Sequence, residues 1–145
     1  MSPARAAGRL IARVDGGSRG NPGPAGFGVV LENEAGAVCG ELKAYLGRQT
    51  NNYAEYQGLL AALRWAREHG VGEIEVRADS ELMVRQMTGR YQVRSEALRP
   101  LFEEARTLAA GFAEFRIVHV PREENRAADR LANEAMDDGA AAYHA

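Results

Sequence analysis

The chain has 145 residues, of which 46% are hydrophobic and 26% charged, the proportions of a single globular domain. A formal net charge of −2 excludes a basic field over the whole molecule, so any nucleic-acid binding would depend on local basic patches. The only cysteine, Cys39, excludes an internal disulfide and favours a reducing compartment, which we expect to be the cytoplasm. No apolar run has the length of a membrane span, and the first residues lack the apolar stretch of a signal peptide.

Hydrophobic periodicity predicts elements in the order βββαβααβα. Alternating apolar residues predict strands over 9–14, 26–31, 38–46, 74–78 and 115–120. Helical spacing predicts helices around 56–67, 80–88, 98–109 and 128–135. We expect residues 1–8 to form a flexible leader and Asp137-Asp138-Gly139 to end the last helix. The folded domain would then span 9–136, and 137–145 would be a flexible tail or the start of a linker.

This order of elements predicts an α/β fold with a five-stranded mixed sheet, antiparallel at first and parallel later, with helices on both faces. Ligands of such sheets gather beyond the carboxyl ends of the strands. Asp15 and Asp79 are both expected at strand ends. The Gly- and Pro-rich segment 15–26 predicts a tight, backbone-exposed turn, and an acid held at its start could bind a hard cation.

Three further acids each have a structural alternative. Asn52 and Glu55 match a capping box, although Glu55 also lies one turn before Leu59 on the core-facing stripe. Asp79 could be the N-cap of the next helix, and Asp129 is one of several acids on a polar helix. Thr50, Asn51 and Asn52 begin a helix, where donors suited to a phosphate are found.

Four segments, taken together, resemble the ribonuclease H type 1 family. They are Asp-Gly-Gly-Ser-Arg-Gly-Asn-Pro-Gly-Pro-Ala-Gly at 15–26, Thr-Asn-Asn-Tyr-Ala-Glu at 50–55, Ala-Asp-Ser at 78–80 and Glu-Asn-Arg-Ala-Ala-Asp-Arg-Leu-Ala at 124–132. The resemblance extends over about 9–136, with the motifs in the family's order and spacing. It implies the ribonuclease H-like fold and endonucleolytic hydrolysis of the RNA strand of an RNA–DNA hybrid, leaving 5′-phosphate and 3′-hydroxyl ends.

The resemblance also implies which residues form the site. The catalytic residues, which would hold two Mg²⁺ ions replaceable by Mn²⁺, are Asp15, Glu55, Asp79 and Asp129. The substrate contacts that it implies are Gly16, Gly17, Asn21, Thr50, Asn51 and Asn52. Backbone and amide groups of this kind can read the 2′-hydroxyls that distinguish RNA from DNA.

Two features depart from the best-known bacterial members. Only Gly89–Ser95 separates the second and third helical patterns, so the family's basic protrusion is missing, as in the compact archaeal-like and actinobacterial-like branch. Hybrid binding would then be weaker and would depend on Arg85, Arg90 and Arg94. His119 lies ten residues before Asp129, which suits the family's auxiliary loop histidine, but it also reads as the end of the fifth strand.

Other functions remain alternatives at this point. An integrase or a Holliday-junction resolvase of the same fold is disfavoured by the extended motif at Asp15, and a non-catalytic binding domain is disfavoured by the presence of all four acids. An aspartyl phosphatase is disfavoured because Gly17 stands where its second acid would be. We expect a monomer that binds RNA–DNA hybrid, with double-stranded RNA as a second candidate substrate and no membrane partner.

Overall fold

The structure, a computed structural model, describes the backbone of residues 8–144 and the side chains of residues 8–139. Almost all of the expected leader therefore lies outside the described residues. One five-stranded sheet in the order β3-β2-β1-β4-β5 forms the centre of the molecule. Its strands are β1 (Arg9–Ser18), β2 (Gly23–Glu32), β3 (Val38–Gln49), β4 (Glu73–Ala78) and β5 (Glu114–His119). Strand β2 pairs antiparallel with both β1 and β3, whereas β4 pairs parallel with both β1 and β5. This arrangement confirms the expected mixed sheet.

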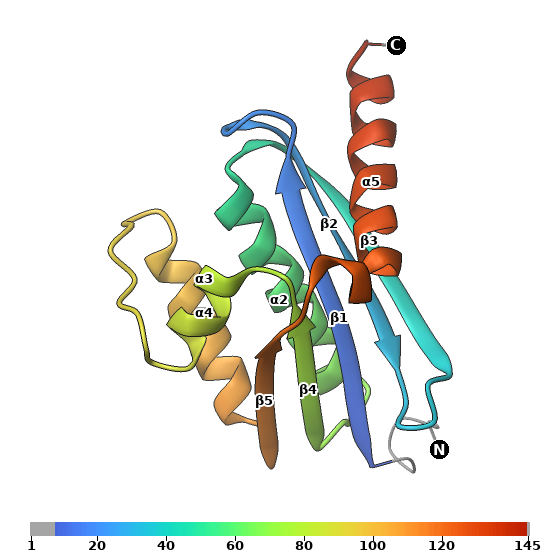
Figure 1. Cartoon of the computed structure of the whole chain (residues 1–145), viewed down its shortest axis with the longest axis vertical. Coiled ribbons are helices and arrows are strands. Elements are labelled where there is room, and N and C mark those ends of the chain that lie inside the picture. Colours follow the sequence, from blue (N-terminus) through green and yellow to red (C-terminus); the bar gives the residue numbers. More distant parts are fainter. Residues whose placement is uncertain (1–7, 145) are drawn as a thin grey trace.

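Helices cover both faces of the sheet (Figure 1). One face packs against α2 (Asn51–Glu68), which itself packs on α4 (Arg99–Ala110), and β1, β2 and β3 carry α5 (Arg126–His144) on the other face. The short α3 (Glu81–Met87) follows β4, and the 3₁₀ turn η1 (Arg122–Glu124) precedes α5. None of the described helices is both long and apolar enough to cross a membrane. The packing of α2 and α5 confirms the expected helices on both faces of the sheet.

The β1–β2 hairpin is longer than the sequence predicts. Gly16, Gly17 and Ser18 continue the ladder opposite Phe27, Gly26 and Ala25, so the turn is confined to 19–22. The boundaries 9–14 and 26–31 are wrong because cross-strand pairing overrides the low strand propensity of this Gly-rich segment. Asp15 accordingly lies inside β1, paired with Gly28, and not at the strand end.

The last helix is also longer than expected. It continues through Asp137-Asp138-Gly139 to His144, so the helix end at 137–139 is wrong. Gly139 lies against the ring of Tyr45 on β3, where a Cβ would overlap the ring. Lys43 of β3 lies 3.4 Å from Glu134 and 3.4 Å from Asp138 of α5. The glycine therefore permits close packing of α5 on β3 and does not end the helix.

Gly28 sets how closely α5 approaches the sheet, and its replacement tests the packing of that layer. A Cβ at Gly28 would overlap the carbonyl of Ala128 and lie 2.6 Å from the Cβ of Leu131. We expect Gly28→Ala to lower the free energy of unfolding by about 2 kcal/mol, because a tightly packed interface tolerates added volume poorly. Thermal denaturation followed by circular dichroism measures the loss. The matched control is Gly72→Ala, where nothing lies within 4 Å of the new Cβ, and a wild-type melting temperature for Gly28→Ala would contradict the prediction.

Candidate active site

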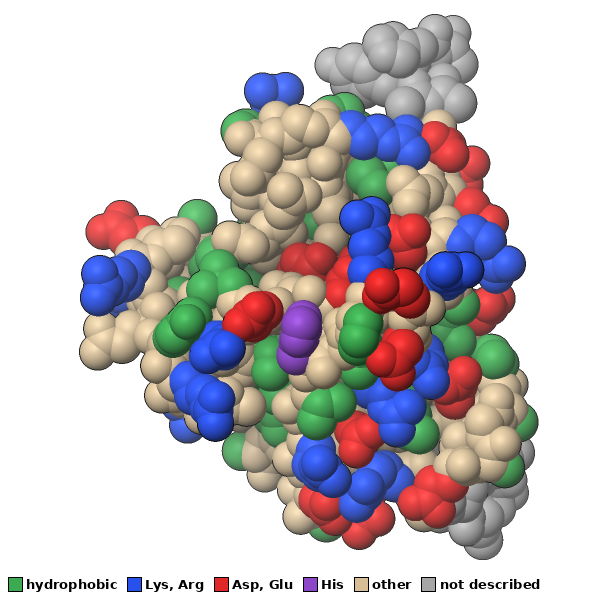
Figure 2. Space-filling model, viewed as in Figure 1, with side chains coloured by type: hydrophobic (Ala, Val, Ile, Leu, Met, Phe, Trp, Pro, Cys, Tyr) green, Lys and Arg blue, Asp and Glu red, His purple; other side chains and the backbone are tan. Residues whose placement is uncertain are grey.

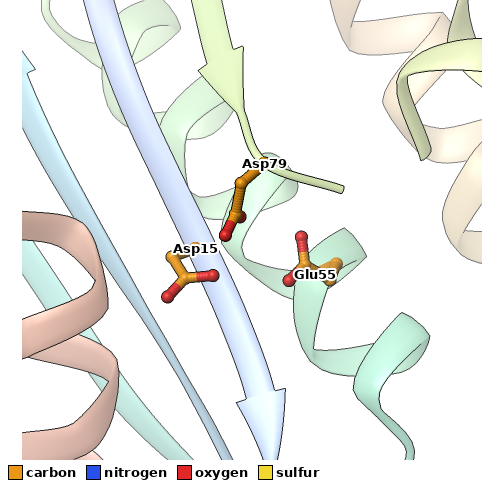
Figure 3. A group of neighbouring side chains, drawn as sticks. All are labelled: Asp15, Glu55 and Asp79. Atoms are coloured by element: carbon orange, nitrogen blue, oxygen red, sulfur yellow. The ribbon is translucent and has the colours of Figure 1, made fainter. Parts of the chain in front are cut away.

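Three carboxylates meet between β1, α2 and the end of β4. Asp15 comes from β1, Glu55 from α2 and Asp79 from the residue after β4, and the side chains point toward one another (Figure 3). Each offers an oxygen atom, and these atoms all lie within 4.8 Å of one another. Asp15 and Glu55 are buried, at 7% and 8% exposure. Carboxylates from three separate segments therefore form one acidic cluster.

The start of α2 directs Glu55 toward the sheet. Thr50 is the N-cap, because its side chain accepts a hydrogen bond from the backbone N–H of Tyr53. Glu55 Oε1 accepts a bond of 3.2 Å from the backbone N–H of Gly16. The capping-box alternative with Asn52 is therefore wrong. Gly16 permits this approach, since a Cβ there would lie 2.5 Å from the carbonyl carbon of Ala54.

Asp79 is free of a capping function. The N-cap of α3 is Ser80, whose Oγ accepts a hydrogen bond from the backbone N–H of Met83. Asp79 Oδ1 and Glu55 Oε2 are both buried, and neither has a hydrogen-bond partner among the described residues. Two orphaned carboxylate oxygens in one cluster indicate that something outside the chain satisfies them.

Asp129 joins these acids from α5. It is half-buried and lines the same pocket of about 360 Å³ as the other three acids. Its carboxylate also interacts with that of Asp15 and lies 3.6 Å from the guanidinium of Arg122. The structure thus brings together all four acids that the sequence singles out, with Asp129 outside the tight group of three.

The expected substrate contacts fall into two places. Gly16, Gly17, Asn51 and Asn52 line the acidic pocket. Asn21 and Thr50 are not among its lining residues, but Asn21 Oδ1 accepts a hydrogen bond of 3.0 Å from the backbone N–H of Asn51. Asn51 Oδ1 in turn accepts from the backbone N–H and the hydroxyl of Ser18. The tip of the hairpin and the start of α2 therefore form one hydrogen-bonded rim.

The remaining candidates lie apart from the acids. Arg85, Arg90 and His119 line a second hollow of about 450 Å³ beside α3. Arg85 is 2.6 Å from Glu81 and lies over the ring of Tyr91. His119 is exposed and is the last residue of β5, opposite Ala78, which confirms the strand interpretation. Arg94 is exposed in the connection between α3 and α4.

Several residues of the site were not predicted from the sequence. Arg19, Arg122 and Asn133 line the acidic pocket, and Arg19 Nη1 lies 2.7 Å from Asp137 of α5. Figure 2 shows acidic side chains recessed near the middle of this face, with basic side chains on the surface around them. The one signal available was the spacing of Asp129, Asn133 and Asp137, four residues apart on a single helix face.

Burial and mutual repulsion raise the pKa values of two carboxyl groups in the acidic cluster. The pKa of Asp15 is raised to about 9, first by removal from water and then by the negative charges of Glu55 and Asp79. Burial raises the pKa of Glu55 to about 8, again with a contribution from Asp79, although the N–H of Gly16 opposes the shift. Strongly perturbed acids in a pocket are characteristic of functional sites.

The donor set fits a divalent cation. Oxygen atoms are the ligands that Mg²⁺ and Mn²⁺ prefer. Glu55 Oε2 and Asp79 Oδ1, two buried oxygens that lack a partner in the part of the chain that the structure describes, are acceptors that a cation would satisfy. A cation would also offset the repulsion that raises the two pKa values.

Known proteins share both the sequence and the fold. A family model described as reverse transcriptase-like matches residues 13–135. Ribonuclease HI of Halobacterium salinarum is 48% identical over 131 residues, covering 90% of this chain and 66% of that protein. The solved RNase H1 of that organism has a TM-score of 0.87 and covers 90% of this chain and 99% of that one. The chain belongs to the ribonuclease H type 1 family.

Two further solved members of the ribonuclease H family are similar. The N-terminal RNase H domain of Rv2228c from Mycobacterium tuberculosis is 46% identical, with a TM-score of 0.90, and covers 93% of this chain and 98% of that chain. LC11-RNase H1, solved in complex with RNA/DNA hybrid, is 44% identical, with a TM-score of 0.85, and covers 90% of this chain and 98% of that chain. The full-length bifunctional Rv2228c is longer, and this chain spans 36% of it. Among the described residues no helix lies between α3 and α4, as expected for a compact ribonuclease H without the basic protrusion.

The raised pKa values predict how the metal-free protein responds to pH. A group whose folded pKa lies above its unfolded value stabilises the fold below the unfolded pKa and loses that contribution as pH rises through the folded pKa. With chelator, the melting temperature should therefore rise as pH falls from about 9 toward about 5. Asp15→Asn, which removes one of the repelling charges, should flatten this dependence and melt above the wild type at the alkaline end. An Asp15→Asn protein that melts well below the wild type there would identify Asp15 as a structural partner.

Proposed function

We propose that this chain is an endoribonuclease that hydrolyses the RNA strand of RNA–DNA hybrids with two divalent metal ions, leaving 5′-phosphate and 3′-hydroxyl ends. The observation that carries the proposal is the acidic cluster of Asp15, Glu55 and Asp79, whose oxygens lie within 4.8 Å of one another. Asp129, on the same pocket, is the fourth acid. Similarity to LC11-RNase H1, which was solved with RNA/DNA hybrid, supports the choice of substrate.

Asp15, Glu55, Asp79 and Asp129 would hold the ions. When bound, a pair of divalent ions lowers the pKa of an attacking water and stabilises the leaving oxygen in an in-line displacement. The carboxylates keep fixed positions because Asp15 lies in a strand paired on both sides and Glu55 is anchored to Gly16 N–H. Such rigid placement is what positions a phosphodiester for attack. We propose Mg²⁺ as the physiological ion, with Mn²⁺ able to replace it.

The hydrogen-bonded rim would recognise the RNA strand. The contacts of Asn21 and Asn51 use their side-chain oxygens as acceptors, so these contacts do not consume the N–H donors of the two amides. With Asn52 and the N-terminal end of α2, these donors are suited to phosphate and 2′-hydroxyl oxygens. Gly16 and Gly17 also line the pocket. The substrate contacts expected from the sequence are therefore retained as a proposal.

Single observations support the proposed cellular location and oligomeric state, and the range of substrates is left to the cleavage assay. We infer that hybrid is the main substrate and retain double-stranded RNA as a second substrate to be tested in the same assay. The single free cysteine suits a reducing compartment, which supports a cytoplasmic location. We propose a monomer, because one chain supplies all four acids of the pocket.

Cleavage should depend on Asp79. Asp79→Asn keeps the size of the side chain but removes a charged oxygen ligand, so Mg²⁺-dependent cleavage of a labelled RNA–DNA hybrid should fall by several orders of magnitude, on the order of 10³ or more. Gel analysis with Mg²⁺, Mn²⁺ and chelator measures the rate. The same assay on double-stranded RNA, duplex DNA and junction DNA separates a ribonuclease H from a resolvase or an integrase.

The matched control for Asp79→Asn is Glu81→Gln, which removes an exposed acid two residues away that pairs with Arg85. It should cleave at a rate close to the wild type. A folded Asp79→Asn protein with near-normal cleavage would refute the metal site, and hybrid binding without cleavage by the wild type would favour a non-catalytic binding domain.

Arg90 and Arg94 should contribute to affinity without sequence preference. Each contact to a phosphate adds about 0.9 to the slope of log affinity against log salt. Replacing both by Ala, in the Asp79→Asn background so that the hybrid stays intact, should weaken binding to all sequences alike and make that slope shallower. Arg64→Ala with Arg67→Ala, on α2, makes the same charge change at residues that line neither the acidic pocket nor the hollow beside α3. Equal effects of the two pairs would show that Arg90 and Arg94 act only through net charge.

A further inference from the structure

Asn125 is a buried polar residue outside the acidic cluster. It lies between η1 and α5 and is 1% exposed. Its Nδ2 donates a hydrogen bond of 2.7 Å to the backbone carbonyl of Val14, the residue before Asp15. Its own carbonyl accepts a bond of 3.0 Å from the backbone N–H of Asp129. One residue thus joins the neighbour of one proposed metal ligand to the backbone of another.

Helix capping does not explain this arrangement. An Asn before a helix usually turns its side-chain oxygen onto a free N–H of the first turn. Here the amide of Asn125 is turned toward β1, and in the described part of the chain its Oδ1 is buried without a hydrogen-bond partner. A buried, unsatisfied oxygen lowers stability. The hydrogen bond to Val14 therefore takes the place of the capping hydrogen bond that the Asn125 side chain would otherwise make at the start of α5.

The contact lies where three segments of the site meet. Val14 is opposite Ala78, the last residue of β4, so the amide supplies a donor where β4 leaves the sheet toward Asp79. Arg13 Nη1 also donates a bond of 2.8 Å to the carbonyl of Glu124. Consecutive residues of β1 therefore hold consecutive residues at the start of α5.

We propose that Asn125 is a positioning residue that holds Asp129 beside Asp15. The inference rests on the proposed function, in which both acids bind divalent cations. When both carboxylates are ionised, as cation binding requires, they repel each other, and the first turn of α5 would move away from β1 unless something held it there. The Asn125–Val14 bond opposes that movement, so the metal site is preformed before any cation arrives.

The test compares stability with metal dependence. Asn125→Ala should raise the Mg²⁺ concentration for half-maximal thermal stabilisation, and that for half-maximal hybrid cleavage, by about tenfold or more, as is typical when a residue supporting a metal ligand is lost. In an Asp129→Asn background the same change should have no further effect on the Mg²⁺ midpoint. Asn125→Ser, which keeps a smaller donor, should give a milder form of the same shift and replaces Asn125→Ala if that variant does not fold.

Tyr56→Phe is the matched control, since it removes a buried hydrogen bond of 2.6 Å to Gln86 on the other side of the sheet. It should lower the melting temperature and leave the Mg²⁺ midpoint unchanged. Asn125 variants that behave like Tyr56→Phe, or that shift the midpoint equally in the Asp129→Asn background, would overturn the proposal. If Asp129→Asn alone leaves the midpoint unchanged, the metal role of Asp129 fails and this inference fails with it. The Asp79→Asn assay still tests the proposed function separately.

Discussion

Repulsion among Asp15, Glu55 and Asp79 is the constraint that the rest of the structure must satisfy. Two unit charges 4.8 Å apart, the largest separation of the ligand oxygens in the cluster, repel by roughly 3.5 kcal/mol at an effective dielectric constant of 20. That is a large share of the stability of an ordinary domain. The acids stay together because each is carried by a separate element, with β1 paired on both sides between β2 and β4 and α2 packed on β1. The sheet thus keeps an acidic cluster in place that local interactions alone would scatter.

Close backbone approach is how the fold brings these elements together. Gly16 lets the first turn of α2 touch β1, and its N–H becomes the hydrogen-bond donor to Glu55. Gly28 does the same for α5 on the opposite face, directly beside Asp15 in the neighbouring strand. Gly16, which the sequence predicts in a tight turn, therefore serves packing, as does Gly28 in β2. A site of this kind lowers stability in return for function, which is a common balance in enzymes.

The sequence predicted the order of elements, the mixed sheet and the four acids, because periodicity and the four motifs are local patterns that carry this information. It failed where a residue's surroundings come from distant segments. Gly139 looked like a helix end, but its packing against Tyr45 depends on β3. Asp15 looked like the end of a strand because the pairing of Gly16 and Gly17 with β2 has no signal of its own. Asn125, one polar residue in a polar segment, could not be distinguished without the fold.

Charge distribution explains how a chain with a net charge of −2 can suit a polyanionic substrate. Because four acids line the metal-free pocket, ionised carboxylates there would repel phosphate, and on the proposed function binding of the hybrid at this point depends on cations that neutralise them. The arginines lie on the rim: Arg19 is paired with Asp137 and Arg122 with Asp129, while Arg90 lines the neighbouring hollow. On the proposed function, cation and hybrid each strengthen the binding of the other, because such coupling is reciprocal. On that proposal, a compact member without a basic protrusion would rely on its metal site for substrate binding as well as for chemistry.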